Sequence, residues 1–432
     1  MANTSKTPAI SFPKLTKELT LLHSLFKKNA FGSKAVRDLF LLEKSGTFLN
    51  NGSFGATPSI IMKVQQYWRE RMEMQPVRFM TKELPAFQYG ALIILSEFLK
   101  TDSRSLAFVD NATTGANAVI RNEMVKWKKG DEILTTNHVY GAVRTTLQYA
   151  AECTGVIIKE AFVPFPIESN QQVIDAIASN ITRKTKMVVI DHITSPSGII
   201  FPVKEIIEIC KKKSVPVFVD GAHAPGMIDL NIDDLQPDWY TGNCHKWLYA
   251  PKGCAFLWTH PSRLKTMHPT IISHGFNQGY RAEFDWVGTK DYSPFLSIGP
   301  SLEFYRATGD EKLRRYFHEK AIEIRALLCT AWKTKKASPD EMIGSLAGVK
   351  VPKHLYHGKA NHMLYAEALH DVLLYDYGIE VPVIAFNNET WIRISVQIFN
   401  QDKQYNLLAE TVNTIKRKDI LEMMKTIQLT RS

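Results

Sequence analysis

Residues 215–258 combine side chains that suit imine chemistry. The segment begins VPVFVDGAH and ends NCHKWLYAPKGCAFLW, so an apolar run ends on Asp220 and Lys246 follows 26 residues later, directly after His245. A lysine beside a tryptophan, near the end of an apolar strand, is poorly placed for simple solvation. We hypothesise that Lys246 forms a Schiff base with pyridoxal phosphate and that Asp220 keeps the pyridine nitrogen protonated.

The chemistry of this cofactor requires such a pair. An imine makes the amino acid Cα–H acidic because the ring accepts the electron pair, and it does so best when its nitrogen is protonated. A nearby carboxylate raises the pKa of that nitrogen by stabilising the cation. The lysine would serve first as anchor and then as the base that moves the Cα proton. Alone, an aspartate at a strand end is usually a cap and a lysine a solvated charge. Together, with histidines between and beside them, they favour a site.

DGAH followed by NCHKW resembles the class V aminotransferase branch of the fold type I pyridoxal-phosphate enzymes. The likeness, over residues 46–400, is to isopenicillin N epimerase-like proteins and to carbon–sulfur lyases of thiol-histidine pathways. It implies an α/β fold with a mostly parallel, seven-stranded type of sheet, helices on both faces, and a smaller α+β C-terminal domain. We expect an N-terminal arm and helix at 1–45 that packs with the small domain, a large cofactor-binding domain at 46–310 and the small domain at 311–432.

A phosphate site is expected where residues 110–115 lead from a short apolar strand into a helix. Backbone N–H groups and hydroxyls at a helix N-terminus bind anions. Thr114 is the best hydroxyl, and Gly115 lets the backbone come close. The alternative is an ordinary N-cap, since threonine often begins a helix.

The resemblance implies five further cofactor contacts. Tyr140 would lie on the ring face and could carry protons, Ser195 would touch the phenolate side, and His223 would lie near the ring hydroxyl. Asn243 and His245 would contact the phosphate.

Substrate contacts are expected from three separate segments. Asn51 lies in a strand-to-turn stretch at 47–55 that is matched equally well by a plain turn. Arg393, on an alternating strand, would clamp the substrate carboxylate with two parallel hydrogen bonds. In relatives the residue at Thr289 reaches the phosphate of the neighbouring subunit, which implies a homodimer with a shared active site.

Strands and helices alternate along the chain in the way that builds a parallel sheet. Expected strands are 106–109, 132–135, 156–163, 187–191, 215–219, 238–241 and 253–258. Their ligand should lie at the carboxyl ends. Further helices are expected at 58–74, 87–100 and 301–336, with a break near Gly309. The C-terminal part should hold strands 345–351 and 390–398 and helices 361–377 and 402–425.

Composition limits the class of protein. A chain of 432 residues, 45% apolar and 22% charged, fits a soluble enzyme with a large and a small domain. No apolar run reaches membrane-spanning length and no secretory signal is visible. Five scattered cysteines favour a reducing, cytoplasmic compartment, although the acid-free residues 1–17 leave an organelle transit segment open.

Neither nucleic acid nor a metal is expected as a partner. The formal charge is +10, but the denser lysine groups at 211–213 and 333–336 lie at predicted helix ends, where they complement the helix dipole. His354, His357 and His362 lack the accompanying residues of a metal motif.

Several reactions share proton removal by Lys246. Persulfide chemistry is disfavoured because residues 330–432 contain no cysteine. We favour β-elimination from a sulfur-substituted cysteine or its sulfoxide, which gives aminoacrylate and then pyruvate and ammonia. Epimerisation, with Tyr140 as the second acid, and transamination are the alternatives. A non-catalytic cofactor-binding relative is a third possibility, disfavoured by the intact Asp220, Lys246 and Arg393.

Overall fold

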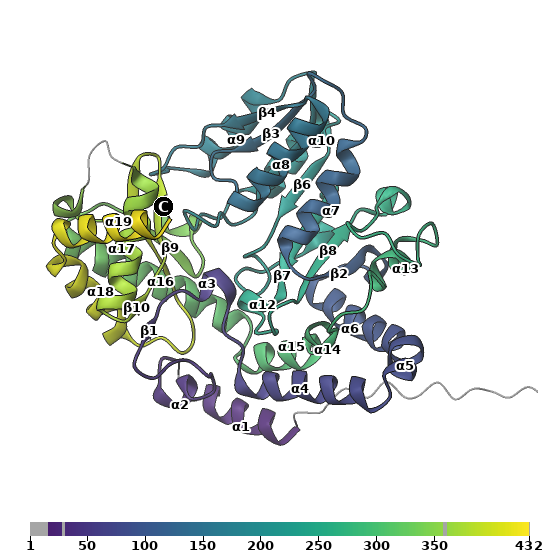
Figure 1. Ribbon diagram of the computed structural model, residues 1–432, viewed down its shortest axis with the longest axis horizontal. Helices are drawn as coiled ribbons and strands as arrows, with labels where there is room; N and C mark the ends of the chain where they lie inside the picture. The colour runs from purple at the N-terminus through teal and green to yellow at the C-terminus, as the bar shows by residue number, and fades with distance from the viewer. Residues whose placement is uncertain (1–15, 28–30, 357–360, 432) are drawn as a thin grey trace, which may run out of the picture.

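A seven-stranded sheet forms the centre of the larger part of the molecule (Figure 1). The computed structural model describes residues 16–27, 31–356 and 361–431. In spatial order the strands are β2 (Leu106–Val109), β8 (Ala255–Thr259), β7 (Trp239–Asn243), β6 (Val217–Asp220), β5 (Thr185–Asp191), β3 (Glu132–Thr136) and β4 (Ile157–Ala161). β4, β3, β5, β6 and β7 run parallel, whereas β8 is antiparallel to both of its neighbours. The predicted fold class, a mostly parallel sheet between helices, is confirmed.

Alternate residues of the central strands belong to two separate cores, one on each face of the sheet. On β6, Val217 and Val219 join one core and Phe218 the other. The first core is covered by α6 (Leu84–Leu99), α9 (Asn170–Asn180) and α10 (Val203–Lys212), and the second by α7 (Ala112–Met124) and α8 (Gly141–Thr154). A strand buried on both faces is apolar throughout, which is why these segments lack polar alternation.

A layer of helices closes one end of the molecule, below the sheet in Figure 1. It contains α1 (Thr16–Lys27), α4 (Ser59–Met74) and α15 (Ile298–Ala307), and α16 (Glu311–Trp332) continues from it to pack on the C-terminal part of the chain. The predicted helix at 301–336 is indeed interrupted at Gly309, whose φ of +98° suits glycine. Phe26 of α1 meets the edge of the Phe304 ring at 6.1 Å, so the N-terminal helix packs on α15. The domain boundaries at residues 45 and 310 stay predictions.

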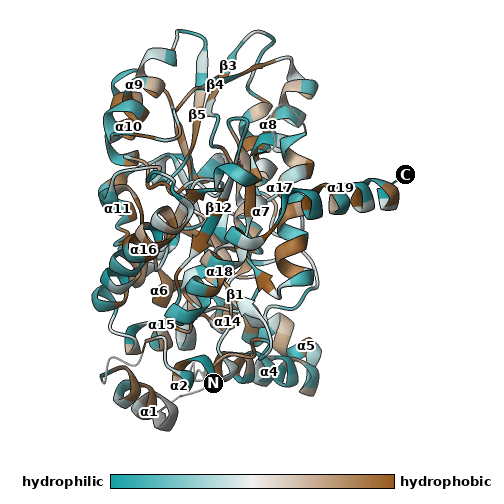
Figure 2. Ribbon diagram, turned by 90° about the vertical axis from the view of Figure 1, so that its left-hand side faces the viewer, coloured by the Kyte–Doolittle hydropathy of each residue, from teal (hydrophilic) through white to brown (hydrophobic). Residues whose placement is uncertain are grey.

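A second, antiparallel sheet belongs to the C-terminal part. Its order is β11 (Val383–Phe386), β12 (Glu389–Ser395), β9 (Leu346–Lys350). It is accompanied by three helices, α17 (His362–Asp371), α18 (Asp402–Thr414) and α19 (Arg417–Arg431). The C-terminal end of α19 projects from the body of the molecule (Figure 2). The sequence did not predict β11, and the single helix expected at 402–425 is two helices separated near Ile415. A short parallel bridge, β1 (Thr47–Phe48) with β10 (Ile379–Glu380), ties the N-terminal segment to this part.

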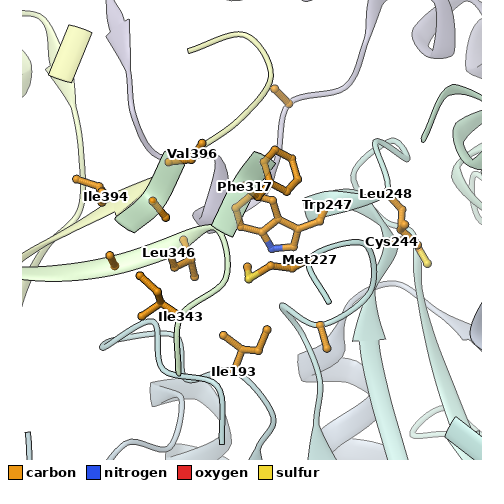
Figure 3. Close-up of a cluster of buried hydrophobic side chains, with 14 of the residues drawn as sticks. Ile193, Met227, Cys244, Trp247, Leu248, Phe317, Ile343, Leu346, Ile394 and Val396 are labelled. Atoms are coloured by element: carbon orange, nitrogen blue, oxygen red, sulfur yellow. The ribbon is translucent and has the colours of Figure 1, made fainter. Parts of the chain in front are cut away.

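The two parts meet in an apolar cluster around Trp247 (Figure 3). The Trp247 ring meets Phe317 of α16 edge-on at 5.9 Å, with Met227 and Leu346 beside it. This contact anchors the residue that directly follows Lys246. No helix in the described ranges has the length and apolar character that a membrane crossing requires. The same ranges contain no cluster of three or more side chains suited to a metal ion.

Candidate active site

A cavity of about 460 Å³ lies at the carboxyl ends of the central strands. This is the edge at which ligands bind in open α/β sheets. The lining residues come from the segments after β2, β3, β5, β6 and β7, together with the N-terminal Ser53 and Phe54: Asp110, Asn111, Ala112, Thr113, Tyr140, Asp191, Ile193, Ser195, Asp220, Ala222, His223, Asn243, His245, Lys246, Lys252 and Gly253.

Lys246 projects into this cavity from the short helix α12 (Cys244–Trp247), which directly follows β7. The side chain is only 8% exposed, and Nζ lies 3.1 Å from Nε2 of His223. Burial, reinforced by the charge of Arg393 and opposed by Asp220, lowers the lysine pKa to about 7. A large fraction of the amine is therefore uncharged near neutral pH, as a nucleophile or a base must be.

Asp220 ends β6 and is buried. One carboxylate oxygen accepts the Ala222 N–H at 2.9 Å, and none of the described lysines, arginines or histidines forms an ion pair with the group. Burial raises the pKa of Asp220, while the Ala222 N–H and Lys246 counteract the rise. The carboxylate is thus available to a cationic group in the cavity.

Asp191 is a second buried acid that the sequence analysis treated only as a strand end. It lies beside Asp220 in the register of β5 and β6, and its Oδ2 has no hydrogen-bond partner among the described residues. Burial and the neighbouring Asp220 raise its pKa. The sequence did contain a signal for this pair of acids. Both strands end on an aspartate, and the carboxyl ends of adjacent parallel strands lie together.

Two histidines line the cavity beside the lysine. His223 accepts a hydrogen bond at Nδ1 from the Trp247 indole (3.4 Å), and His245 places Nδ1 3.0 Å from the Cys254 carbonyl. Burial first, and then the nearby lysine, lower the pKa of His223 well below its ordinary value and that of His245 to about 4. Both rings are therefore neutral at physiological pH.

The N-terminus of α7 faces the cavity through Asn111, Ala112 and Thr113. Asn111 caps the helix by accepting the Thr114 N–H at 2.9 Å, and Asn243 Oδ1 accepts the Ala112 N–H at 2.9 Å. Thr114, whose hydroxyl was predicted to bind the phosphate, lines a second, adjacent cavity that shares Asp110 and Thr113 with the first.

Gly115 is likewise set back from the main cavity. A Cβ there would lie 2.3 Å from Thr241 Oγ1, so the glycine permits close packing of α7 on β7. The predicted phosphate contacts of Thr114 and Gly115 stay predictions.

Arg393 reaches the same region from β12 of the small sheet. It is 3% exposed, and it donates to the Ser195 carbonyl and Oγ and to Asn50 Oδ1 and Ser53 Oγ. No carboxylate among the described residues pairs with it, and its Nε has no partner there. Burial lowers its pKa to about 10. A buried guanidinium surrounded only by neutral groups is a ready partner for an anion.

Three other predicted residues are placed as follows. Tyr140, at the N-terminus of α8, lines the cavity and is 43% exposed. Asn51 does not line the cavity: its amide donates to the Lys246 carbonyl and accepts the Ala56 N–H, both at 3.0 Å. Thr289 is exposed and lines neither cavity. Its predicted contact involves a second subunit and stays a prediction.

Comparison with known proteins places this geometry in context. The model of the family described as aminotransferase class-V matches residues 94–404. A probable L-cysteine desulfhydrase, chloroplastic, of Arabidopsis thaliana is 30% identical over 395 residues, covering 85% of this chain and 82% of the relative. An isopenicillin N epimerase of Amycolatopsis lactamdurans is 25% identical over 401 residues, covering 88% and 98%.

Solved structures share the fold. The cystine C-S lyase C-DES, solved with its reaction product cysteine persulfide, superposes with a TM-score of 0.73 at 20% identity, covering 86% of this chain and 98% of that one. An apo cysteine desulfurase from Thermococcus onnurineus NA1 gives a TM-score of 0.71 at 17% identity, covering 88% and 98%. At these identities the likeness concerns the arrangement of helices and strands.

Proposed function

The chain belongs to the aminotransferase class-V family and uses pyridoxal 5'-phosphate, and from this premise we propose that it cleaves the carbon–sulfur bond of cysteine or of a sulfur-substituted cysteine. One observation carries the proposal. A buried lysine with a lowered pKa and an aspartate without an ion-pair partner line one cavity, and a buried arginine without a counter-ion donates hydrogen bonds to Ser195 and Ser53 of the same lining. An α-amino acid brings the carboxylate and the Cα–H that these groups would engage.

The residues of the cavity fit this cofactor. Lys246 would anchor it, and Asp220 would hold the proton on its ring nitrogen. The N–H groups at the start of α7, with Asn243 and His245, would receive its phosphate. Buried polar atoms that lack partners, such as Asp191 Oδ2, indicate a cavity built for a polar occupant. Tyr140 would cover the ring, and Ser195 and His223 would meet its oxygen side.

When bound, the cofactor supplies an electron sink next to the substrate Cα. Arg393 holds the substrate carboxylate, which fixes the Cα–H relative to Lys246. Lys246 removes that proton, the Cβ–S bond breaks, and the sulfur takes a proton from the protonated lysine and leaves as hydrogen sulfide from cysteine, as a thiol from a thioether or as a sulfenic acid from a sulfoxide. Water then converts the released aminoacrylate to pyruvate and ammonia.

The thiol positions argue against a persulfide mechanism. Cys210, Cys244 and Cys254 are buried, and no cysteine of the described residues lines the cavity. A desulfurase needs a mobile thiol that reaches the substrate sulfur. Elimination needs none, and L-cysteine desulfhydrase is also the name of the Arabidopsis relative.

Epimerisation is the second candidate, and Tyr140 favours it. Its half-exposed phenol lines the cavity and could return a proton to the face opposite the lysine. The similarity to isopenicillin N epimerase supports the same reading.

Assembly and location complete the proposal. A homodimer would bring Thr289 of one subunit to the phosphate of the other, and sedimentation of wild type and Thr289→Ala with and without cofactor tests this. We place the protein in the cytoplasm, with an organelle as the alternative because one relative is named chloroplastic.

Incubation with L-cysteine, an S-alkyl cysteine and its sulfoxide in heavy water separates the reactions. We expect pyruvate together with sulfide or the matching thiol or sulfenic acid. Deuterated, inverted amino acid without pyruvate would instead establish an epimerase. Lys246→Ala should lose both turnover and the visible absorption of the bound cofactor. Lys252→Met, which alters the other lysine of the cavity, should retain the absorption; a colourless wild-type protein that takes up no cofactor would contradict the proposal.

A further inference from the structure

Trp247 directly follows the lysine, and its indole N–H has no part in the function proposed above. We propose that Trp247 is a positioning residue: its N–H fixes the neighbouring His223 ring in the Nε2–H tautomer, and this tautomer holds Lys246 as an uncharged amine. The inference rests on the proposed role of Lys246 as the anchoring amine and base.

The three side chains form a buried chain in which Trp247 Nε1 lies 3.4 Å from His223 Nδ1, and His223 Nε2 lies 3.1 Å from Lys246 Nζ. All three side chains are buried, and His223 and Lys246 also line the cavity.

An indole N–H can only donate, so His223 Nδ1 must present its lone pair. The charged and titratable groups acting on the ring are Lys246, Arg393 and His245, all of which disfavour an imidazolium, as burial does. A neutral ring without a proton on Nδ1 carries it on Nε2.

The Nε2–H of His223 points along the 3.1 Å contact, so Lys246 Nζ must accept, and only an unprotonated amine has a lone pair to do so. The reverse tautomer would present a lone pair to the lysine and favour the ammonium form. Trp247 therefore acts in the same direction as burial and Arg393, which lower the lysine pKa, and against Asp220, which raises it.

The indole is held from the far side by the small domain. It packs edge-on against Phe317 of α16, with Met227 and Leu346 alongside (Figure 3). The orientation of the N–H is thus determined by the packing between the two parts of the molecule.

A double-mutant cycle tests the inference through the rate at which apoprotein takes up pyridoxal 5'-phosphate as pH is varied. Trp247→Phe keeps most of the packing and removes the N–H. We expect its uptake profile to move to higher pH by about one unit, which makes uptake roughly fivefold slower at pH 7 and about tenfold slower at lower pH, with the wild-type rate restored in alkali.

His223→Gln provides the second background of the cycle. A glutamine amide has no tautomers, so it can donate a hydrogen bond to the lysine whether or not the Trp247 N–H is present. There, Trp247→Phe should cause no further shift. An equal shift in both backgrounds would mean that Trp247 acts by packing alone, and no shift in either would equally overturn the inference. Trp239→Phe removes a buried indole N–H that has no partner among the described residues, and it should leave the profile unchanged.

Nitrogen-15 NMR of histidine-labelled apoprotein examines the tautomer without cofactor or turnover. The His223 signals, identified by their loss in His223→Gln, should show a protonated Nε2 and an unprotonated Nδ1. A proton on Nδ1 would refute the inference even if the enzyme proves to be a lyase. A correct tautomer in a protein that takes up no cofactor would refute the proposed function instead.

Discussion

Burial prepares the individual side chains of this site for chemistry. Burial lowers the pKa of Lys246 to about 7 and that of Arg393 to about 10, so the lysine is largely uncharged near neutral pH whereas the arginine stays a cation without a carboxylate partner among the described residues. An enclosed charge without a partner is costly in the free protein. The cost is recovered when a ligand of opposite charge binds, so the arrangement favours substrate over water.

Arg393→Lys should separate charge from geometry. Lysine keeps the positive charge but cannot form two parallel hydrogen bonds to a carboxylate. Losing one charge-assisted hydrogen bond of about 1.5–3 kcal/mol should lower kcat/KM by roughly 10- to 150-fold, mainly through KM. Steady-state kinetics measures the effect.

Ser53→Ala is the control, because it removes only one 3.4 Å neighbour of the guanidinium and should change kcat/KM no more than a few-fold. An unchanged KM in Arg393→Lys would remove this residue from carboxylate binding.

The sequence predicted the site residues that follow the central strands better than those contributed by segments distant in the sequence. Lys246, Asp220 and His223 were singled out from one local stretch, and the structure brings them into one cavity. Asn50 was missed because its contact with Arg393 spans 343 positions and leaves no local pattern. Trp247 was noted only as an apolar neighbour, since the direction of an indole N–H depends on tertiary packing.

Helices and strands position the site through close approaches that only small residues permit. Gly115 lies where α7 crosses β7, and a Cβ there would lie 2.3 Å from Thr241 Oγ1. Gly141 is the first residue of α8, which follows β3, and a Cβ there would meet nothing within 4 Å. It therefore serves as a control for Gly115, which is the fourth residue of α7.

Gly115→Ala should push α7 away from β7 and so displace the predicted phosphate site. We expect a loss of about 1–3 kcal/mol in the free energy of unfolding, as for overpacked cores, and at least tenfold weaker cofactor binding. Gly141→Ala should be neutral or stabilising by up to about 1 kcal/mol because alanine favours the helix. Urea unfolding and cofactor titration provide both values, and equal behaviour of the two variants would contradict this account.

The sequence predicted the strands that are buried on both faces well. It did not predict the elements whose formation depends on pairing or packing with another segment of the chain. The apolar β6 and β7 leave few alternatives, so their existence followed from composition. β11 is a half-buried strand that exists because it pairs with β12, and nothing in its own residues required that partner. The break near Ile415 likewise follows from packing, since no glycine or proline marks it.

Across the molecule, buried neutral histidines make stability depend on acidity. His138, His192 and His245 lie in three different segments, and burial lowers the pKa of each to about 4. In the unfolded chain the same groups titrate near 6.5. Their contribution is fully present above pH 6.5 and is lost as the pH falls from 6.5 to about 4, because the unfolded state then binds protons that the folded state excludes.

Together, these three groups should reduce the stability of the apoprotein by about 4 kcal/mol per pH unit within that window when all three titrate. His223, whose pKa is also lowered, adds to the loss, whereas Asp191 and Asp220, whose pKa values are raised, oppose it. Urea denaturation at a series of pH values measures the slope. His192→Gln should make it shallower by about 1.4 kcal/mol per unit, and an unchanged slope would refute the assignment.

The pairing of β1 with β10, and the reach of Asn50 and Ser53 to Arg393, have a consequence for biosynthesis. A ribosome completes the N-terminal half of this contact hundreds of codons before the C-terminal half emerges. The nascent polypeptide can fold its central sheet early, as domains commonly do during translation. It cannot build the carboxylate pocket until the codon for Arg393 has been read, so a product terminated before that codon would carry the lysine yet have no means of holding an amino acid.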